Sequence, residues 1–467
     1  MVITRAVSGK TLRILLSFLI IAACGSVATR TKFYEPITRS LQSGNYEAAI
    51  EKFEEARTKG DFSQKDHFLY YLDSGALYHY ASEYDSSNAR LTEAENAAEE
   101  LFTRSISRAA TSILLNDNVL EYSGEDYEVL YSNLVKALNY AALDKFDDAF
   151  VEIRRANLKL DLLEQKYLGA AQTLNRGAAG DSGDEKVDYS PAKVRFNNDA
   201  LARYLSMHIY AAEGKYDDAR IDYELLQEAF QTQPDIYNFP MPDVKYSSDS
   251  GAVLSVIALA GLSPVKEAIN LRIRTDKDLG LVQVLYTDSE NKDVEYGHLP
   301  LPVKADYYFK FAIPKIVQRP SEITTIRVYA DSQFVGELRL LEDVGKVAEE
   351  TFEAKKSLVY VRSVLRAVAK GLATHQLKKK ADTGGVQGWL KKAAIDVGSD
   401  VSENADLRCS RLLPGKIYAG DFEIRPGKYN LSIEFLDQSG HIINKQCKTG
   451  YEVAVTGLNM MSVNFPQ

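Results

Sequence analysis

The stretch GNYEAAIEKFEEA, residues 44–56, predicts the architecture of the first half of the chain. Its Gly-Asn pair is typical of a tight turn, and Tyr46, Ala49, Phe53 and Ala56 then recur at the spacing of one helix face. A small residue such as Ala49 lets a second helix come close, and the aromatic side chains fill the space beside it. We therefore expect a turn followed by a helix that packs against the helix before it.

Three more units between residues 33 and 230 repeat this arrangement of small and aromatic residues. They are Tyr71, Gly75, Tyr78, Tyr84, Ser87, Leu91 and Ala94; then Tyr140, Phe146, Ala149, Ile153 and Ala156; then Tyr210, Gly214, Tyr216, Ala219 and Tyr223. Repetition at this scale predicts paired helices. The units resemble tetratricopeptide repeats, which implies an α-helical repeat domain over 33–235. Long gaps between units, with extra helix over 95–125 and a loop over 169–187, predict a compact domain with insertions.

The tetratricopeptide resemblance also implies a concave face made by the first helix of each pair. Aligning the units places Leu69, Leu72, Tyr131, Leu134, Leu138, Tyr204 and His208 on that face. An open apolar face would bind a partner helix, with Tyr131, Tyr204 and His208 as contact residues. The alternative, which we favour, is that inserted helices cover the face and its residues belong to the core, because an exposed apolar groove promotes aggregation.

From about residue 250 the hydrophobic period becomes that of strands. Alternating apolar residues on both sides of 330–332 predict a hairpin. Residues 429–435 alternate apolar and polar side chains, which predicts a strand with one wet face. Two further strands are predicted from Val453, Val455, Met461, Val463 and Phe465.

A long helix over about 346–380 is predicted between these strands, with a second helical piece over 386–396 that contains Trp389. Its apolar face comprises Phe352, Leu358, Val361, Leu365, Val368 and Leu372. The expected fold class is α+β with two domains. A tetratricopeptide-like domain over 33–235 precedes a β-sandwich-like domain over 250–467, which carries the helical insertion over 346–396.

Arg362, Arg366 and Lys370 form a basic stripe on the long helix, extended by the lysines at 378–380. Such a stripe would dock an acidic partner or an anionic polymer. The alternative is a solvated helix face whose charges pair with the preceding glutamates and with the helix dipole. Both interpretations stay open on sequence alone.

The N-terminus has the organisation of a secretory signal peptide. Arg5, Lys10 and Arg13 precede an apolar run over 14–23, which is much shorter than the roughly 20 residues that span a bilayer. The sequence Ile-Ala-Ala-Cys ending at Cys24 resembles the lipobox of bacterial lipoproteins. That resemblance implies removal of 1–23, acylation of Cys24, and a tether over 24–32. The Gly after Cys24 favours the outer membrane, and an ordinary signal peptide with a chance Cys is the alternative.

Composition limits the classes of partner. The hydrophobic content of 45% and charged content of 26% are those of a soluble globular body. A net charge of −9 argues against a nucleic-acid partner. Cys409 and Cys447 are the cysteines that follow Cys24, and a disulfide between strands and two free buried thiols are both open alternatives.

The sequence carries no strong catalytic signal. The six histidines lack metal-ligand spacing, and the sequence contains neither a P-loop nor a dinucleotide-binding motif, so we expect no metal, no cofactor and no enzyme activity. Ser190-Pro-Ala-Lys193, Ser248-Asp-Ser250 and Lys448-Thr-Gly450 imitate the motifs of penicillin-binding serine enzymes. Their expected positions, in a loop and in a turn, are wrong for that chemistry. The carboxylates at 125, 126 and 128 fit helix capping better than an acid–base pair.

The order of these parts resembles a family of uncharacterised bacterial lipoproteins with tetratricopeptide-like helices. The features that carry this resemblance are Tyr122-x-Gly124-Glu125-Asp126-Tyr127-Glu128, the segment 149–157, Ala405-Asp406-x-Arg408 and Leu413-Pro414. The family implies a periplasm-facing outer-membrane lipoprotein of a Gram-negative bacterium. Its expected function is a protein–protein scaffold in envelope assembly or maintenance. A module that binds peptidoglycan or polysaccharide through residues 250–467, or a regulator of a cell-wall synthase, is the alternative.

Overall fold

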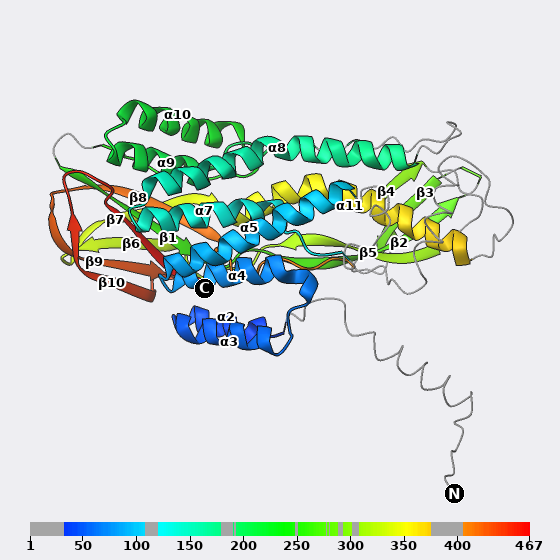
Figure 1. Ribbon diagram of the computed structural model, residues 1–467, viewed down its shortest axis with the longest axis horizontal. Helices are drawn as coiled ribbons and strands as arrows, with labels where there is room; N and C mark the ends of the chain where they lie inside the picture. Colours follow the sequence, from blue (N-terminus) through cyan, green and yellow to red (C-terminus); the bar gives the residue numbers. More distant parts are fainter. Residues whose placement is uncertain are drawn as a thin grey trace, which may run out of the picture.

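The computed structural model describes residues 32–107, 120–178, 190, 193–247, 251–276, 278–279, 281–287, 293–300, 308–374 and 405–467. Helices make up its first half and strands most of its second half (Figure 1). The helices are α2 (Tyr34–Gln42), α3 (Tyr46–Thr58), the 3-10 turn η1 (Gln64–Asp66), α4 (His67–Tyr80), α5 (Tyr84–Ser107), α7 (Asp126–Ala142), α8 (Phe146–Ala178), α9 (Ala200–Ala212), α10 (Tyr216–Thr232) and α11 (Val344–Thr374). None of these helices is long and apolar enough to cross a membrane.

Within the described residues, α2–α3, α4–α5, α7–α8 and α9–α10 are helical hairpins joined by the same turn. The middle residue of each turn is left-handed, at φ 75° for Gly44, 60° for Ser82, 56° for Asp144 and 75° for Gly214. The next amide donates back into the first helix, as from Lys215 N to the carbonyl of residue 210 at 2.8 Å, which satisfies a helix-end carbonyl. The predicted pairing of helices is therefore confirmed at the predicted positions.

Gly75 shows why each pair needs a small residue. A Cβ atom placed on Gly75 of α4 would lie 2.6 Å from the side chain of Leu91 in α5. The Ser87 hydroxyl also donates to the Gly75 carbonyl at 2.7 Å, which holds the two helices at this separation.

We expect Gly75→Ala to lower the free energy of unfolding by about 1–3 kcal/mol, because α4 and α5 must move apart to admit the methyl group. Urea denaturation measures the loss. Gly169→Ala in α8 is the matched control, since no atom lies within 4 Å of its added Cβ and alanine favours the helix. Equal stability of the two variants would contradict the close approach.

The strands form two sheets. They are β1 (Ala252–Ala260), β2 (Val265–Asp276), β3 (Leu281–Thr287), β4 (Asp293–Pro300), β5 (Tyr308–Val317), β6 (Thr325–Ala330), β7 (Gln333–Asp343), β8 (Lys416–Ile424), β9 (Gly427–Leu436), β10 (Ile442–Val453) and β11 (Met460–Phe465). The larger sheet has the order β10-β9-β6-β7-β8-β1-β11, with only its β1–β11 pair parallel. The smaller sheet has the order β4-β3-β2-β5 and is antiparallel throughout.

The expected β-sandwich is wrong. The seven-stranded sheet curls on itself, so that Gln446 Nε2 of its edge strand β10 donates to the Asn464 carbonyl of the opposite edge strand β11 at 2.6 Å. Its inward side chains fill the nearly closed, barrel-like sheet, where Val256, Ile433 and Phe435 are completely buried. The four-stranded sheet lies beside it along the long axis and packs under α11 (Figure 1).

Several local strand predictions are confirmed. Residues 331 and 332 form the two-residue turn between β6 and β7, and both have positive φ, as hairpin turns require. The alternating segment 429–435 lies in β9, and Met461, Val463 and Phe465 lie in β11. Val455 falls beyond the end of β10 and is exposed. The long predicted helix is α11, whereas the helical piece over 386–396 lies outside the described residues.

One hydrophobic core joins the helices to the strands, although the sequence divides near residues 235–250. This core contains Leu72 and Leu134 of the helices together with Ile257 of β1, Leu341 of β7 and Ala419 of β8. The inner side of the helical hairpins is therefore covered by the chain's own strands, and inserted helices are not needed to fill it.

Candidate functional site

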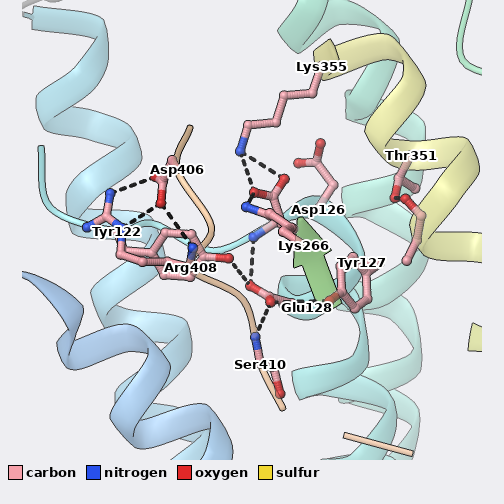
Figure 2. Close-up of polar contacts among 12 residues, drawn as sticks. Tyr122, Asp126, Tyr127, Glu128, Lys266, Thr351, Lys355, Asp406, Arg408 and Ser410 are labelled. Carbon is pink, nitrogen blue, oxygen red and sulfur yellow. Dashed lines mark hydrogen bonds and ion pairs between the residues drawn. The ribbon is translucent and has the colours of Figure 1, made fainter. Parts of the chain in front are cut away.

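A cleft of about 310 Å³ opens where the helices meet the four-stranded sheet. Its wall combines apolar side chains, such as Phe352 and Leu358 of α11, with a group of charged ones. Figure 2 shows polar contacts of the charged group. The charged side chains come from segments far apart in the sequence: the segment before α7 and the start of that helix, α8, the first part of β2, α11 and the segment before β8.

The start of α7 contributes two buried carboxylates. Glu125 is the N-cap residue and Glu128 the third residue of the helix, and the Glu125 amide donates to Glu128 Oε2 at 2.8 Å in a capping box. Both side chains are buried, at 2% and 0% exposure. The prediction that these carboxylates cap a helix is confirmed.

Glu125 is the anion of an internal ion cluster. Lys266 of β2 donates to its Oε1 atom, and Lys355 of α11 lies 2.8 Å from each of its two oxygens. Burial disfavours the charge on Glu125, but the two ammonium groups outweigh it and lower its pKa to about 2. The cluster thus joins α7, β2 and α11 through a charge that persists at neutral pH.

Glu128 connects α7 to the segment that precedes β8. The Tyr122 hydroxyl donates to its Oε2 atom at 2.7 Å, and the Ser410 amide donates to its Oε1 atom at 2.5 Å. Burial and the neighbouring charge of Glu125 raise the pKa of Glu128 to about 7. Two carboxylates one helical turn apart therefore differ strongly in acidity, because Lys266 and Lys355 both pair with Glu125.

Arg408 binds three parts of the chain at the base of the cleft. Its guanidinium makes a two-bond contact with Asp406, at 2.9 and 2.8 Å, and also donates to Asp66 at 2.9 Å and to the Leu120 carbonyl at 3.0 Å. Burial disfavours the charge of Asp406, yet Arg408 lowers the pKa of its carboxyl to about 2. Figure 2 shows Asp406, Arg408 and Ser410 on one irregular segment that passes beside Tyr122.

The arrangement neutralises its charges internally and is suited to binding and to holding segments together. Cys409, the thiol next to Arg408, is buried, and burial raises its pKa to about 11, so it is protonated and a poor nucleophile at neutral pH. Among the described residues, no group of three or more His, Cys, Asp and Glu has the geometry to hold a metal ion.

The predicted partner-binding residues do not line a groove. Tyr131, Tyr204 and His208 are 0%, 0% and 4% exposed. The Tyr204 hydroxyl donates to Asp421 of β8 at 2.6 Å, and His208 Nε2 lies 3.1 Å from the same carboxylate. Their assignment as contact residues for a partner is wrong, because strands of the same chain occupy the inner side of the hairpins. The favoured alternative is right in placing these residues in the core, but strands of the same chain, and not inserted helices, cover them.

The other candidate residues do not come together at one site in the described part of the chain. Arg362 lines the cleft, whereas the side chains of Arg366 and Lys370, and all of Cys24, lie outside the described part of the chain. Cys409 is buried and Cys447 of β10 is exposed, and both are free, so the disulfide alternative is wrong.

Of the penicillin-binding motifs, the first lies in a loop as predicted, and the last does not lie in the predicted turn. Lys448 lies within β10 and not in a turn, and Ser190 is an exposed residue between α8 and α9. The middle motif, at 248–250, is outside the described residues.

Sequence reasoning missed Lys266, Lys355 and Asp66 as members of the charged group. The signals for the site were the carboxylates at the start of α7 and the pair Asp406 and Arg408 before β8. Lysines in an amphipathic strand or helix are normally solvated, and nothing local marks one that is buried.

No family model matches this chain, and neither a curated protein nor a solved structure matches it.

Proposed function

We propose that the protein is a lipid-anchored, non-catalytic scaffold on the periplasmic face of the outer membrane of a Gram-negative bacterium. The lipobox-like sequence at Cys24 supports the anchor, and the four hairpins with their common turn support a tetratricopeptide-like repeat domain. Because strands cover the inner side of the hairpins, partners bind the outer surface of the helices.

The observation that carries this proposal is the outer face of α8. This helix has 33 residues, whereas its neighbours α9 and α10 have 13 and 17, and its second half extends beyond them (Figure 1). Val151, Leu158 and Leu162 recur on one face and are 39%, 55% and 46% exposed.

An amphipathic helix of an envelope protein is the partner that fits this face. Each hairpin already packs against the next one in the chain, so a partner helix laid along α8 would continue the same packing. The flanking Arg155 is half exposed and supplies a charged rim beside the apolar residues.

The test is crosslinking in intact cells, followed by purification of the lipidated protein and mass spectrometry of its companions. We expect one recurring envelope protein, whose recovery falls at least about tenfold in the double variant Leu158→Asp/Leu162→Asp, a loss of about 1.4 kcal/mol of binding. The matched control is Ile442→Asp/Val455→Asp, which changes two exposed apolar residues of the strand-rich half, one in β10 and one beyond its end.

Equal recovery from both variants would overturn the assignment of α8. Recovery of cell-wall fragments alone would favour the alternative function, binding of peptidoglycan or polysaccharide by residues 250–467. Capture of a cell-wall synthase through α8 would define the scaffold as a regulator of that enzyme.

A further inference from the structure

Three buried oxygen atoms around the start of α9 have no hydrogen-bond partner among the described residues. They are Oδ2 of Asp199, Oε1 of Glu342 and the hydroxyl of Tyr131, each in a side chain that is 0% exposed. Buried polar atoms are nearly always paired, and each one left unpaired costs roughly 1–3 kcal/mol. The two unpaired carboxylate oxygens among them need a hydrogen-bond donor, and a proton on one of the two carboxyl groups is such a donor.

The three side chains come from elements that pack against one another. Asp199 is the N-cap of α9 and accepts from the Ala202 amide at 2.7 Å. Glu342 stands near the end of β7, and its Oε2 atom accepts from the Leu201 amide at 3.3 Å. Two carboxylates, one local and one from the sheet, therefore meet at one helix N-terminus.

The surroundings stabilise one negative charge better than two. The helix N-terminus supplies the amides of residues 201 and 202 and the positive end of the α9 dipole. The Tyr237 hydroxyl adds one hydrogen bond, to Glu342 Oε2 at 3.1 Å. Arg203, the nearby cation, directs its guanidinium to Asn198 and Asp222.

Other titratable or charged groups face Asp199 and Glu342 from the neighbouring elements. They are Arg203 of α9, Tyr131 of α7, Tyr237 after α10, Asp343 at the end of β7 and, around Asp343, Lys346 of α11 and Lys416 of β8. Asp343 is itself an anion that opposes a second charge on Glu342, and its amide partner is Lys346 N at 3.1 Å.

We propose that Asp199 and Glu342 share one proton, which fastens the α9–α10 hairpin to the end of β7. A proton between Asp199 Oδ2 and Glu342 Oε1 gives both atoms a partner and leaves one negative charge for the helix N-terminus. A single proton therefore satisfies the two carboxylate oxygens, whereas the Tyr131 hydroxyl has no hydrogen-bond partner among the described residues.

The pair makes the attachment of the hairpin depend on pH. Burial, and then the mutual repulsion of the two carboxylates, raises the pKa of Glu342 well above its usual range, and burial raises the pKa of Asp199. A carboxyl whose folded pKa is raised stabilises the fold fully below its unfolded pKa of about 4, and that stabilisation disappears as pH rises through the folded value. Alkaline pH therefore loosens the hairpin.

The experiment uses the full chain and compares hydrogen exchange of α9 and α10 amides at pH 6 and pH 9, corrected for intrinsic exchange rates. We expect the protection factors of the wild type to fall about tenfold between pH 6 and pH 9. This factor corresponds to a difference of one pKa unit in proton binding between the closed and open states of the hairpin. In Glu342→Gln the fall is less than twofold, because the amide has no proton to lose. Asp199→Asn is the second variant, and asparagine also caps helices well, so this variant retains the α9 N-cap.

Glu423→Gln is the matched control, since Glu423 is an exposed carboxylate of β8 paired with Lys245, and it should keep the wild-type pH profile. Infrared difference spectra supply an independent readout. The carbonyl stretch of a protonated carboxylic acid should be present at pH 7 in the wild type and weaker in both pair variants. A wild-type pH profile in both pair variants, or an unchanged carboxylic acid band, would overturn the shared proton.

Discussion

Arg408→Met is expected to lower the free energy of unfolding by about 3–5 kcal/mol, the range for removing one member of a buried ion pair. The guanidinium is only 5% exposed and joins Asp406, Asp66 and the backbone at Leu120. Methionine has similar length but leaves Asp66, which is 0% exposed, without this cation. The free energy of unfolding of a folded domain is about 5–15 kcal/mol in total, so this substitution removes much of the stability.

Urea denaturation followed by circular dichroism measures this loss. Arg327→Met is the control, because Arg327 forms a partly exposed pair with Glu337 on the protein surface, and surface pairs contribute little. The free energy of unfolding at acid pH provides a second check. Asp406 has a lowered pKa of about 2, so its stabilisation is present above about pH 4 and is lost as pH falls towards 2. In Arg408→Met this acid-dependent part should shrink, and stability equal to that of Arg327→Met would refute the assignment.

Tyr204→Asp is expected to destabilise the fold by about 5 kcal/mol, at the exceptional end of the effects of single substitutions. Removing the ring empties a fully buried site, and the new carboxylate faces Asp421, which accepts the Tyr204 hydroxyl at 2.6 Å. Two buried carboxylates would then compete for His208. Solubility, thermal melting and near-ultraviolet circular dichroism report the loss.

Tyr216→Asp is the control: it makes the same Tyr-to-Asp change at an exposed position, and so separates the effect of burial from the effect of the substitution itself. Tyr216 begins α10 and is 55% exposed, and an acidic residue at a helix N-terminus is favourable, so stability should change by less than about 0.5 kcal/mol. A folded Tyr204→Asp protein that had lost only a binding partner would show instead that Tyr204 faces a groove.

Local signals in the sequence predicted much of the secondary structure. The small and aromatic residues around Gly44, Gly75 and Gly214 predicted helical hairpins, and the hairpins occur there with a common left-handed turn. Alternation over 429–435 predicted β9, and the carboxylates at the start of α7 predicted a cap. These features depend on residues within one or two turns of each other, and sequence displays such relations directly.

Non-local pairing was much harder to predict. The four-stranded sheet was missed, and the seven-stranded sheet was expected to be half of a sandwich, because order and curvature depend on which strands pair. Parallel pairing of β1 with β11 joins residues about 200 positions apart, and no local pattern specifies it.

The sequence by itself determined the helical hairpins, their turns, the N-terminal cap of α7 and the strands with clear alternation. Only the tertiary structure decided what lies against the hairpins and which charged side chains are buried. Lys266 and Glu125 are separated by 141 residues, and Tyr204 and Asp421 by 217. Burial and the acidity of buried groups follow from neighbours brought together by folding, and the side chains themselves carry no local mark of those neighbours.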